Sequence, residues 1–505
     1  MRLTLSKLFS DGIFELDTGE NPFHGDGNTS YIHQIEDLTA YSHTLVSNNA
    51  LASGAIETIT TNVAGKGLRV QSQIDWEFLG ITEEEAVKFQ AKAETLFNNV
   101  ARSREIDIMG KMNFYALQGL VYRVSKESGE TLALLPLIED GTHCPVKIKV
   151  LEGLHLSTPL DQQTNERVIA GVEVNTHGKI THYHISKHHP YSREHTESLY
   201  RLKRNPIGSE YKRIPVKSGL KTNVLHIYDM KRAGQRRGVP YLAPIINTLY
   251  KLDRYTEAEI DAAVLNARFS AVIQNENPEN GEEPVDKNTK VSIKKGNVVK
   301  LPAGWSIKTI DPSRPNQGYD PFFKALVLQI CMALNLSFEV FMKQFNSSYT
   351  AAQGSIIEGK KMFGVERQNI LASQFCQPIY EEYMLRFVLD GKLEAKGFLD
   401  DPAIRSAWCR TEWVGDAQED MNKTRAIEAS NKACEYGFST RDREAKQLNG
   451  TDYLRNIMHS KKETEMLEDS GLPYIGTKLD QMKLEKNNDK EEKRIMTRKR
   501  NDIIV

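Results

Sequence analysis

The sequence predicts a mainly helical α+β protein with more than one domain. Its 505 residues are more than one hydrophobic core usually holds. Long stretches repeat apolar residues at helical spacing, which is typical of amphipathic helices. Between about residues 130 and 230, short strand-like runs instead alternate with turn residues, which indicates a small antiparallel sheet or barrel.

Composition and charge are those of an ordinary globular protein. Hydrophobic residues make up 39 % and charged residues 26 %, which excludes a wholly disordered chain. The net charge of −1 excludes a globally basic nucleic-acid binder but leaves room for local basic patches. The five cysteines include no C-x-x-C pair, so neither a disulfide framework nor a zinc ribbon is indicated.

We expect a soluble intracellular protein without a membrane segment. The N-terminus has no continuous apolar region of the kind found in secretory signals. The longest mainly apolar run, Ala325–Leu336, is interrupted by Gln329 and Asn335. It is shorter than the roughly 18 residues that a membrane span needs.

The first 125 residues are expected to be mostly helical. Ile35–Ala64 keeps apolar residues at helical spacing, and Gly65 and Gly67 then end it. Glu83–Val100 is a second amphipathic stretch. The strand-like runs follow in the order LALLPLI, VKIKVLE, VIAGVEV, ITHYHIS and NVLHIYD.

A long helix is predicted from Pro240 to Arg268, because its apolar residues keep one face. Other positions of this helix are acidic. These carboxylates suit metal binding or acid–base chemistry, but a solvated helix face explains them better in a single chain. The four acidic residues are Asp253, Glu257, Glu259 and Asp261.

A turn-rich insertion, Phe269–Tyr319, follows this helix and reads as a polar loop with two or three short strands. The lysines of this insertion could bind phosphates or an acidic partner. They could equally lie on edge strands and prevent aggregation between sheets, and the sequence favours neither explanation. Helix resumes at Asp320. A polar break and a second long helix, Ala351–Leu389, come next, with a kink predicted at Pro378.

No catalytic motif is present: we find no phosphate-binding loop, nucleophile elbow or zinc-protease pattern. The densest histidine group comprises His177, His182, His184, His188, His189 and His195. On a strand, His182 and His184 would project to one face, as a metal site requires. Surface histidines on a strand and turn are the commoner meaning of such a pattern. We therefore predict no metal and no cofactor.

Several strings, taken together and in order, resemble the portal proteins of tailed double-stranded DNA bacteriophages, in particular the lambda-type family. The most specific is VLHIYDMKRAGQRRGVPYLAPIINTLYKLDRYTEAEIDAA, Val224–Ala263. NNALASGAIETITTNVAGKGLRV, SSYTAAQGSIIEGKKMF, FCQPIYEEYM and GFSTRDREAKQLNGTDY are similar to further blocks. The resemblance runs from about Asn48 to Asp452. Ser348 and Gln353 depart from it, because family members carry Asn and Arg around that motif.

The resemblance implies a portal-type fold with a wing, a two-helix stem, a small β-containing clip and a helical crown. Residues 1–238 would be the wing, 239–268 and 320–341 the stem helices, and 269–319 the clip between them. The tunnel loop would be 342–353, the long wing helix 354–391, the crown 392–477, and a charged tail 478–505.

The resemblance also implies a function. Portals form rings, usually dodecamers, at one capsid vertex, where double-stranded DNA passes during packaging and ejection without sequence-specific contacts. The implied partners are the terminase large subunit, the major capsid protein and head-completion or adaptor proteins. The location would be the virion, and the host cytoplasm during assembly. Such a protein is not an enzyme and has no membrane contact.

Two other functions stay open at this point. One is a metal-dependent DNA-processing enzyme that uses the His177–His195 cluster. The other is a capsid scaffold or tail adaptor without a channel.

Three groups of residues acquire a role from the resemblance. The acidic residues of the first stem helix, Asp253, Glu257, Glu259 and Asp261, would line the channel and repel DNA phosphates. The DNA-facing tunnel loop would contain Lys343, Gln344, Phe345, Asn346, Ser347 and Ser348. Partner binding by the clip would use Lys290, Lys294, Lys295, Lys300, Trp305 and Lys308.

Overall fold

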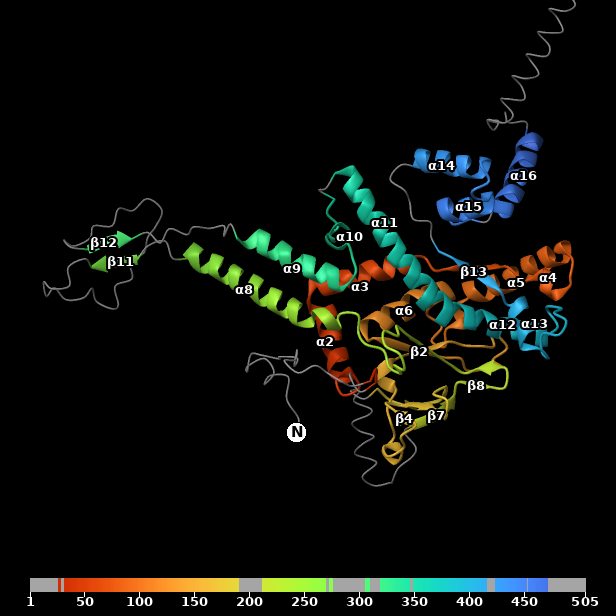
Figure 1. Ribbon diagram of the computed structural model, residues 1–505, viewed down its shortest axis with the longest axis horizontal. Coiled ribbons are helices and arrows are strands. Elements are labelled where there is room, and N and C mark those ends of the chain that lie inside the picture. Colours follow the sequence, from red (N-terminus) through yellow and green to blue (C-terminus); the bar gives the residue numbers. More distant parts are fainter. Residues whose placement is uncertain are drawn as a thin grey trace, which may run out of the picture. The chain divides into compact units, whose positions relative to one another are not determined.

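The computed structural model describes residues 26–28, 31–189, 211–268, 272–275, 305–308, 318–345, 348–415, 423–451 and 453–470. They belong to two compact units, Met1–Gly415 and Asp416–Val505. The predicted mainly helical α+β class is confirmed (Figure 1). Within these ranges, no helix combines the length and apolar character that crossing a bilayer requires.

Five helices come first in the described part of the first unit. They are α2 (Ile35–Asn48), α3 (Ala50–Val63), α4 (Trp76–Leu79), α5 (Glu83–Arg102) and α6 (Phe114–Glu127). The single helix predicted over Ile35–Ala64 is divided, because Asn49 adopts an extended conformation. The Asn49 side chain accepts a hydrogen bond from the Ala52 amide and so begins a new helix there. The predicted helix Glu83–Val100 is confirmed, and its start is fixed by a capping box between Thr82 and Glu85.

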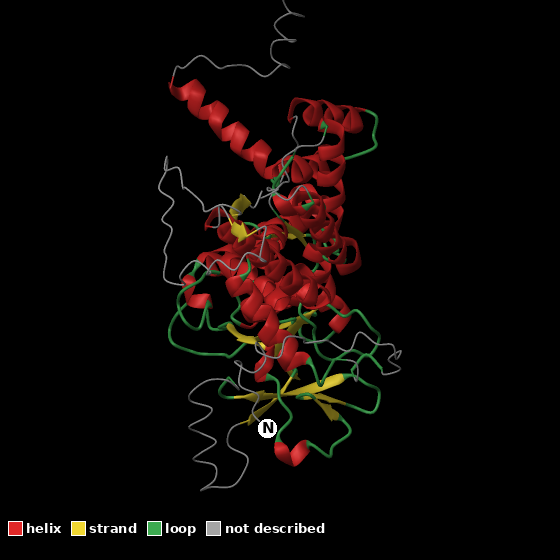
Figure 2. Ribbon diagram, turned by 90° about the vertical axis from the view of Figure 1, so that its left-hand side faces the viewer, coloured by secondary structure: helices red, strands yellow, loops and turns green. Residues whose placement is uncertain are grey.

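The strand-rich region forms two small antiparallel sheets rather than one. The first has the order β10-β2-β3 and the second β4-β5-β6-β7. Buried Leu132, Tyr183 and Val224 pack between them, and Figure 2 shows these strands gathered to one side of the helices. The strand bounds are β2 (Glu130–Leu134), β3 (Lys149–Glu152), β4 (Val168–Ile169), β5 (Val172–Val174), β6 (Ile180–Ser186), β7 (Tyr211–Pro215) and β10 (Val224–Tyr228), with the short pair β8 (Lys217–Ser218) and β9 (Lys221–Thr222) between the last two.

The helix predicted from Pro240 begins later, as α8 (Ile246–Arg268), after a 3₁₀ turn at Ala243–Ile245. The residues before α8 contact α6 instead of continuing the helix: the Tyr241 amide donates a 2.9 Å hydrogen bond to the carbonyl oxygen of Lys126. Pro244 lies in the first positions of the 3₁₀ turn, where a missing N–H is tolerated. In the insertion, β11 (Val272–Asn275) pairs with β12 (Trp305–Lys308).

The second predicted stem helix, residues 320–341, is interrupted. It consists of α9 (Tyr319–Ala333) and the short α10 (Phe338–Met342). Asn335 has a φ of 53°. This left-handed conformation ends helices, and asparagine tolerates it better than most residues.

The long helix is continuous but not uniformly α-helical. It runs from α11 (Tyr349–Glu366) through a π-helical segment, Arg367–Cys376, to α12 (Gln377–Leu389). The Gln377 amide donates to the carbonyl of Ala372, five residues back. The predicted kink at Pro378 is therefore replaced by a wider turn just before it, in which the proline begins α12.

The first compact unit ends at Gly415, whereas the predicted crown begins at residue 392. Residues 392–415 therefore pack with the first unit. After α13 (Pro402–Trp408), β13 (Thr411–Val414) pairs antiparallel with β1 (Arg69–Ser72). Trp413 contacts Phe97, Phe114 and Tyr380 in the aromatic centre of the core. The second unit begins at Asp416, and its described helices are α14 (Lys423–Glu435), α15 (Arg441–Asn449) and α16 (Tyr453–Ser470).

Candidate functional site

The helices α8 and α9 lie side by side and form the long pair that the sequence places around the insertion (Figure 1). Aromatic rings join their outer ends. The Tyr255 ring is stacked 5.7 Å from Tyr319 and meets Phe322 edge-on at 4.9 Å. Nearer the wing, Leu249 and Leu252 of α8 and Val327 of α9 are buried in the main core. The pair is thus rooted in the main core at one end. As names for these parts only, α8 and α9 are called the stem, and the rest of the first unit is called the wing.

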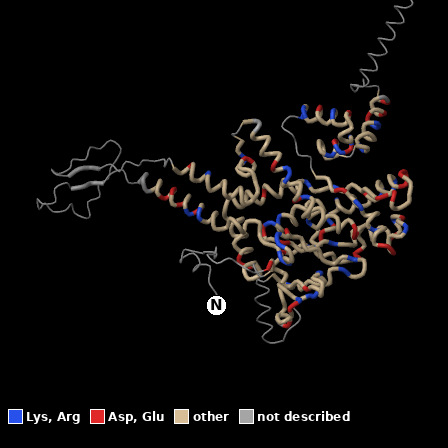
Figure 3. The backbone as a smooth tube through the Cα atoms, viewed as in Figure 1, with Lys and Arg blue, Asp and Glu red and all other residues tan. Residues whose placement is uncertain are grey.

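The acidic residues of α8 do not form one group. Asp253, Glu257 and Asp261 are four residues apart and share a helix face, whereas Glu259 lies on another. The three are exposed and Glu259 is half-buried. Figure 3 shows acidic positions recurring along α8. The candidate channel lining therefore reduces to a row of three carboxylates.

The first residue of this row is already engaged. The Asn49 amide nitrogen lies 2.7 and 2.8 Å from the two carboxylate oxygens of Asp253. Asn49 also caps α3, so one side chain ties the break between α2 and α3 to α8. Asp253 thus holds the stem against the wing. Among the side chains that the structure describes, no hydrogen bond of this kind reaches Glu257 or Asp261.

Large apolar side chains are exposed on both helices. On α8, Ile260 and Val264 follow the carboxylates Glu257 and Asp261 by three residues and so lie beside them. On α9, Leu328 is 50 % exposed and Met332 is 81 % exposed. Such rows are unusual on a solvent-facing surface and are typical of helices that pack against another chain.

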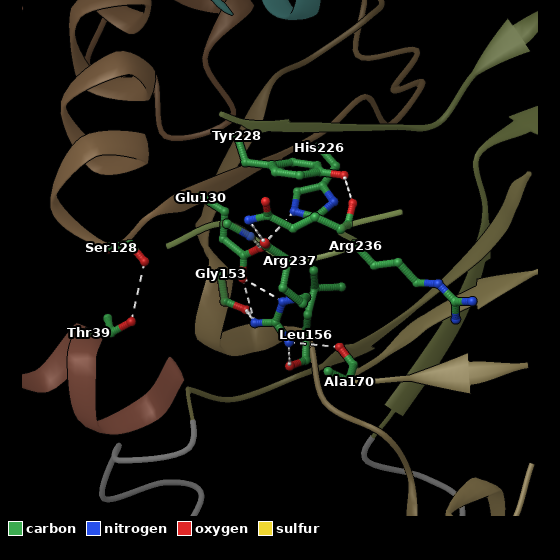
Figure 4. A network of polar contacts seen from close by, with 12 residues as sticks. Thr39, Ser128, Glu130, Gly153, Leu156, Ala170, His226, Tyr228, Arg236 and Arg237 are labelled. Atoms are coloured by element: carbon green, nitrogen blue, oxygen red, sulfur yellow. Dashed lines mark hydrogen bonds and ion pairs between the residues drawn. The ribbon is translucent and has the colours of Figure 1, made fainter. Parts of the chain in front are cut away.

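The root of the stem is held by a buried ionic group (Figure 4). Glu130 at the start of β2 and Arg237 just before α8 form an ion pair, with Nε to Oε1 at 2.6 Å. The remaining guanidinium nitrogens donate to three backbone carbonyls, those of Gly153, Leu156 and Ala170. One arginine therefore connects the approach to α8 with the loops of both sheets.

The second oxygen of Glu130 is also occupied. It accepts from the Gly238 amide at 2.8 Å and lies 2.9 Å from Nε2 of His226. Burial would raise the pKa of Glu130, but the charge of Arg237 and the hydrogen bonds of His226 and Arg237 outweigh it and lower this pKa to about 2. Glu130 is thus a fully ionised carboxylate inside the protein.

The backbone at this root leaves no space for a side chain. A Cβ on Gly238 would lie 2.0 Å from the Gly129 carbonyl oxygen. Gly129 itself has a φ of +90°, and a Cβ there would lie 2.5 Å from the carbonyl carbon of Val239. Only glycine fits at both positions, because the two chain segments touch directly.

The turn preceding Arg237 is organised by a buried glutamine. The Oε1 atom of Gln235 accepts from the amides of Lys231 and Arg232, and its Nε2 donates to the Arg237 carbonyl. Asn28 clamps the outside of the same turn by donating to Gly234 and accepting from Arg236. The hydrogen bonds of Gln235 and Asn28 thus fix the conformation of the segment RAGQRRG, residues 232–238.

A second buried contact joins the root to the long helix. Lys126 at the end of α6 pairs with Glu366 at 2.7 Å, directly before the π-helical segment. The Lys126 nitrogen also lies over the rings of Tyr122 and Tyr241. The Tyr241 hydroxyl donates to the Leu334 carbonyl at the end of α9. The sequence gives no signal for these pairs, because the partners are far apart along the chain.

The predicted tunnel loop is only partly described. Lys343 ends α10 with a φ of 54°, and Gln344 and Phe345 are exposed. Ser348 is the N-cap of α11 and accepts from the Ala351 amide, so residues 349–353 are helical rather than loop. Ser355 donates to Glu339 at 2.8 Å, which ties the two flanking helices together. Asn346 and Ser347 lie outside the described residues.

Of the clip candidates, the structure describes only the backbone of Trp305 and Lys308. They are the first and last residues of β12, opposite Asn275 and Val272. Four further candidates lie outside the described residues: Lys290, Lys294, Lys295 and Lys300.

The histidine group does not form a metal centre. His182 and His184 do share a face of β6, but their carboxylate neighbour Glu173 is bound by Arg213 through two hydrogen bonds of 2.8 Å. The Arg213 hydrogen bonds are the largest influence that lowers the pKa of Glu173, to about 2. The Arg213 guanidinium thus occupies the carboxylate that a metal ion bound to His182 and His184 would need as a ligand.

The other histidines of this group lie elsewhere. His189 meets His155 and Glu152, His188 accepts a hydrogen bond from Ser186 through its carbonyl, and His177 is in an exposed turn. His195 lies outside the described residues. Nothing supports the metal-dependent enzyme.

Comparison with known proteins decides the family. A family model described as "Phage portal protein, lambda family" matches residues 16–367, more than half of the chain. The chain belongs to this family. The resemblance stated from the sequence is confirmed, and so is the function as a structural portal.

Two relatives of this chain are also named as portal proteins. The chain is 21 % identical over 484 residues to the "Portal protein" of Escherichia phage N15, covering 90 % of this chain and 88 % of that protein. It is 22 % identical over 462 residues to "Portal protein B" of Escherichia phage lambda, covering 85 % and 83 %. A solved chain described as "Neck of native GTA particle computed with C12 symmetry" is 13 % identical with a TM-score of 0.44, covering 82 % of this chain and 92 % of that one.

Proposed function

We propose that this portal protein assembles into a ring of twelve subunits, as its family resemblance implies, and that the stem helices surround a channel for double-stranded DNA. The ring occupies one capsid vertex of the virion and forms in the host cytoplasm. Its clip docks the terminase large subunit and later the head-completion or adaptor proteins, and its outer surface meets the major capsid protein. The protein itself performs no chemistry on DNA.

The observation that carries this proposal is the surface of the α8–α9 pair. One face of α8 presents the carboxylates of Glu257 and Asp261, and exposed aliphatic side chains lie immediately beside them. Neighbouring stems that bury the aliphatic edges would leave the carboxylates facing a shared centre. Carboxylates at that position repel phosphates and keep DNA from binding tightly, so the duplex can slide.

The wing supports this arrangement by fixing the direction of the stem. Three contacts attach the α8 end of the stem to different parts of the wing: Asp253 binds Asn49, Arg237 binds Glu130, and the Tyr241 amide donates to the Lys126 carbonyl. A ring of stems needs every stem to leave its wing at the same angle. The tunnel loop, residues 343–348, lies between α10 and α11 and is assigned the part of the channel that touches DNA without reading its bases.

The first test is imaging. Negative-stain electron microscopy and native mass determination of the purified protein should show rings with a central channel. A monomer that cleaves DNA on addition of a divalent metal would contradict the proposal.

The channel lining is tested by reversing its charge. We expect Glu257→Lys with Asp261→Lys to form normal rings but to slow or stall DNA in a packaging assay, because lysines would bind the passing phosphates. Glu259→Lys is the matched control on another face of the same helix and should package at the normal rate. Equal packaging by both variants would remove these carboxylates from the channel.

A further inference from the structure

Three side chains of metal-binding type lie together on the wing, outside the stem and its root. Glu105 belongs to the 3₁₀ turn Arg104–Ile106 that follows α5, and His143 and Cys144 lie in the loop between β2 and β3. Their carboxylate oxygen, ring nitrogen and sulfur atoms all lie within 4.8 Å of one another. Nδ1 of His143 is 3.1 Å from Oε2 of Glu105.

The backbone around these residues is fixed on both sides. The Ile148 amide donates to the Ile106 carbonyl at 2.7 Å, and the Ile108 amide returns a bond to Ile148. On the other side, the Tyr383 hydroxyl donates to the Val146 carbonyl at 2.5 Å. Backbone hydrogen bonds and the Tyr383 hydroxyl therefore hold the turn and the loop together. Cys144 is fixed in the core, whereas the half-exposed side chains of Glu105 and His143 remain free to adjust.

The nearest lysine does not compete for the site. Nζ of Lys147 lies 3.0 Å from Asp140 and 2.9 Å from the hydroxyl of Thr142. Its charge is thus compensated within the loop. The carboxylate of Glu105 remains directed to His143.

We propose that Glu105, His143 and Cys144 bind one zinc ion, with water as the fourth ligand. A thiolate, an imidazole and a carboxylate match zinc rather than magnesium or calcium, which prefer oxygen ligands alone. Zinc bonds of about 2.0–2.3 Å place neighbouring ligand atoms of a tetrahedral site about 3.5 Å apart. The Glu105 and His143 atoms are already 3.1 Å apart. Binding therefore requires these two side chains to move towards the sulfur, which lies no more than 4.8 Å away. Glu105 and His143 can rotate to do this, because their side chains are 46 % and 53 % exposed.

The sulfur supplies the specificity. Cys144 is fully buried, and burial raises the pKa of its thiol, while a hydrogen bond from Ser103 and the charge of Lys147 oppose this rise. Zinc binding forms the Zn–S bond and releases the thiol proton to solvent, and the Ser103 hydroxyl then stabilises the thiolate.

Spectroscopy with cobalt, which substitutes for zinc, tests the ligand set on the metal-free full-length protein. We expect one cobalt ion per chain, a sulfur-to-cobalt charge-transfer band and the visible absorption of a tetrahedral site. Cys144→Ser should abolish the charge-transfer band. By zinc calorimetry, His143→Ala should weaken binding by roughly tenfold or more, and Ser103→Ala by about tenfold.

Matched controls separate this site from adventitious binding. Cys434→Ser removes a partly exposed cysteine of the second unit, and His177→Ala removes a histidine from an exposed turn; both should leave the cobalt spectrum unchanged. A band that persists in Cys144→Ser, or zinc affinity unchanged in His143→Ala, would overturn the proposal. His143 is exposed, so its variant folds and decides the question even if Cys144→Ser does not.

Discussion

The root of the stem and its flanks are built in opposite ways. At the root, Glu130 and Arg237 are almost completely buried, and each polar atom that they direct inward has a partner. Along the flanks, Leu328 and Met332 expose large apolar surfaces and have no such closure. The difference teaches that contacts within the chain fix how the stem leaves the wing, whereas the apolar flank of the stem is exposed in the single chain and is available to the neighbours that the proposed ring would supply.

The largest effect on stability is expected when the buried ion pair at the root is removed by changing Arg237. We expect Arg237→Ala to lower the free energy of unfolding of the first unit by about 3–5 kcal/mol, because it leaves the Glu130 carboxylate buried and unpaired. The urea midpoint followed by circular dichroism measures this. Arg236→Ala is the control, since that side chain extends away from the network (Figure 4), and it should cost less than about 1 kcal/mol. Equal losses in both variants would refute a special role for Arg237.

Acid should loosen the root before it affects the flanks. The pKa of Glu130 is lowered from 4.5 to about 2 in the folded protein, so ionisation stabilises the fold above pH 4.5. That contribution, about 3 kcal/mol, is lost as the pH falls from 4.5 towards 2. Urea midpoints measured across this range should therefore fall less steeply for Glu130→Gln than for the unaltered protein. Glu84→Gln, at an exposed position of α5, should keep the original slope.

The smallest effect on folding is expected at the flanks. Leu328→Ser with Met332→Ser should change the free energy of unfolding by no more than about 0.5 kcal/mol, because both residues are already in contact with water. The same variant should shift the native mass distribution from rings towards monomers. Met109→Ser, a similarly exposed methionine in a turn of the wing, should leave that distribution unchanged. Rings of normal stability would show that this flank is not an interface.

Local patterns predicted much of this fold. The spacing of apolar residues marked α5 and both stem helices, and the alternating runs marked β2, β6 and β10, because a buried face imposes its period on the sequence. The ordered strings identified the family, as the match to residues 16–367 confirms. These features depend on neighbours within a few residues.

Contacts between distant residues were beyond such patterns. The break at Asn49 depends on Asp253, more than two hundred positions later, and the delayed start of α8 depends on a carbonyl of α6. The sequence offered the four acidic residues of α8 as candidates for the channel lining and could not separate them. In the structure, Glu259 lies on another helix face and Asn49 binds Asp253. Nothing near Glu130 or Arg237 in the sequence identifies them as partners, because 107 positions separate them.

The distance along the chain between Glu130 and Arg237 also determines when this ion pair can form during synthesis. At typical rates of synthesis, Arg237 follows Glu130 by on the order of 5–20 s. Until then the first strand of the sheet carries a charge that it cannot bury, so the two sheets cannot close. The wing therefore matures only after the string leading into the stem has left the ribosome. A nascent chain stopped before Arg237 would therefore stay open at this strand, and its aromatic core would still wait for Trp413, which is made later again.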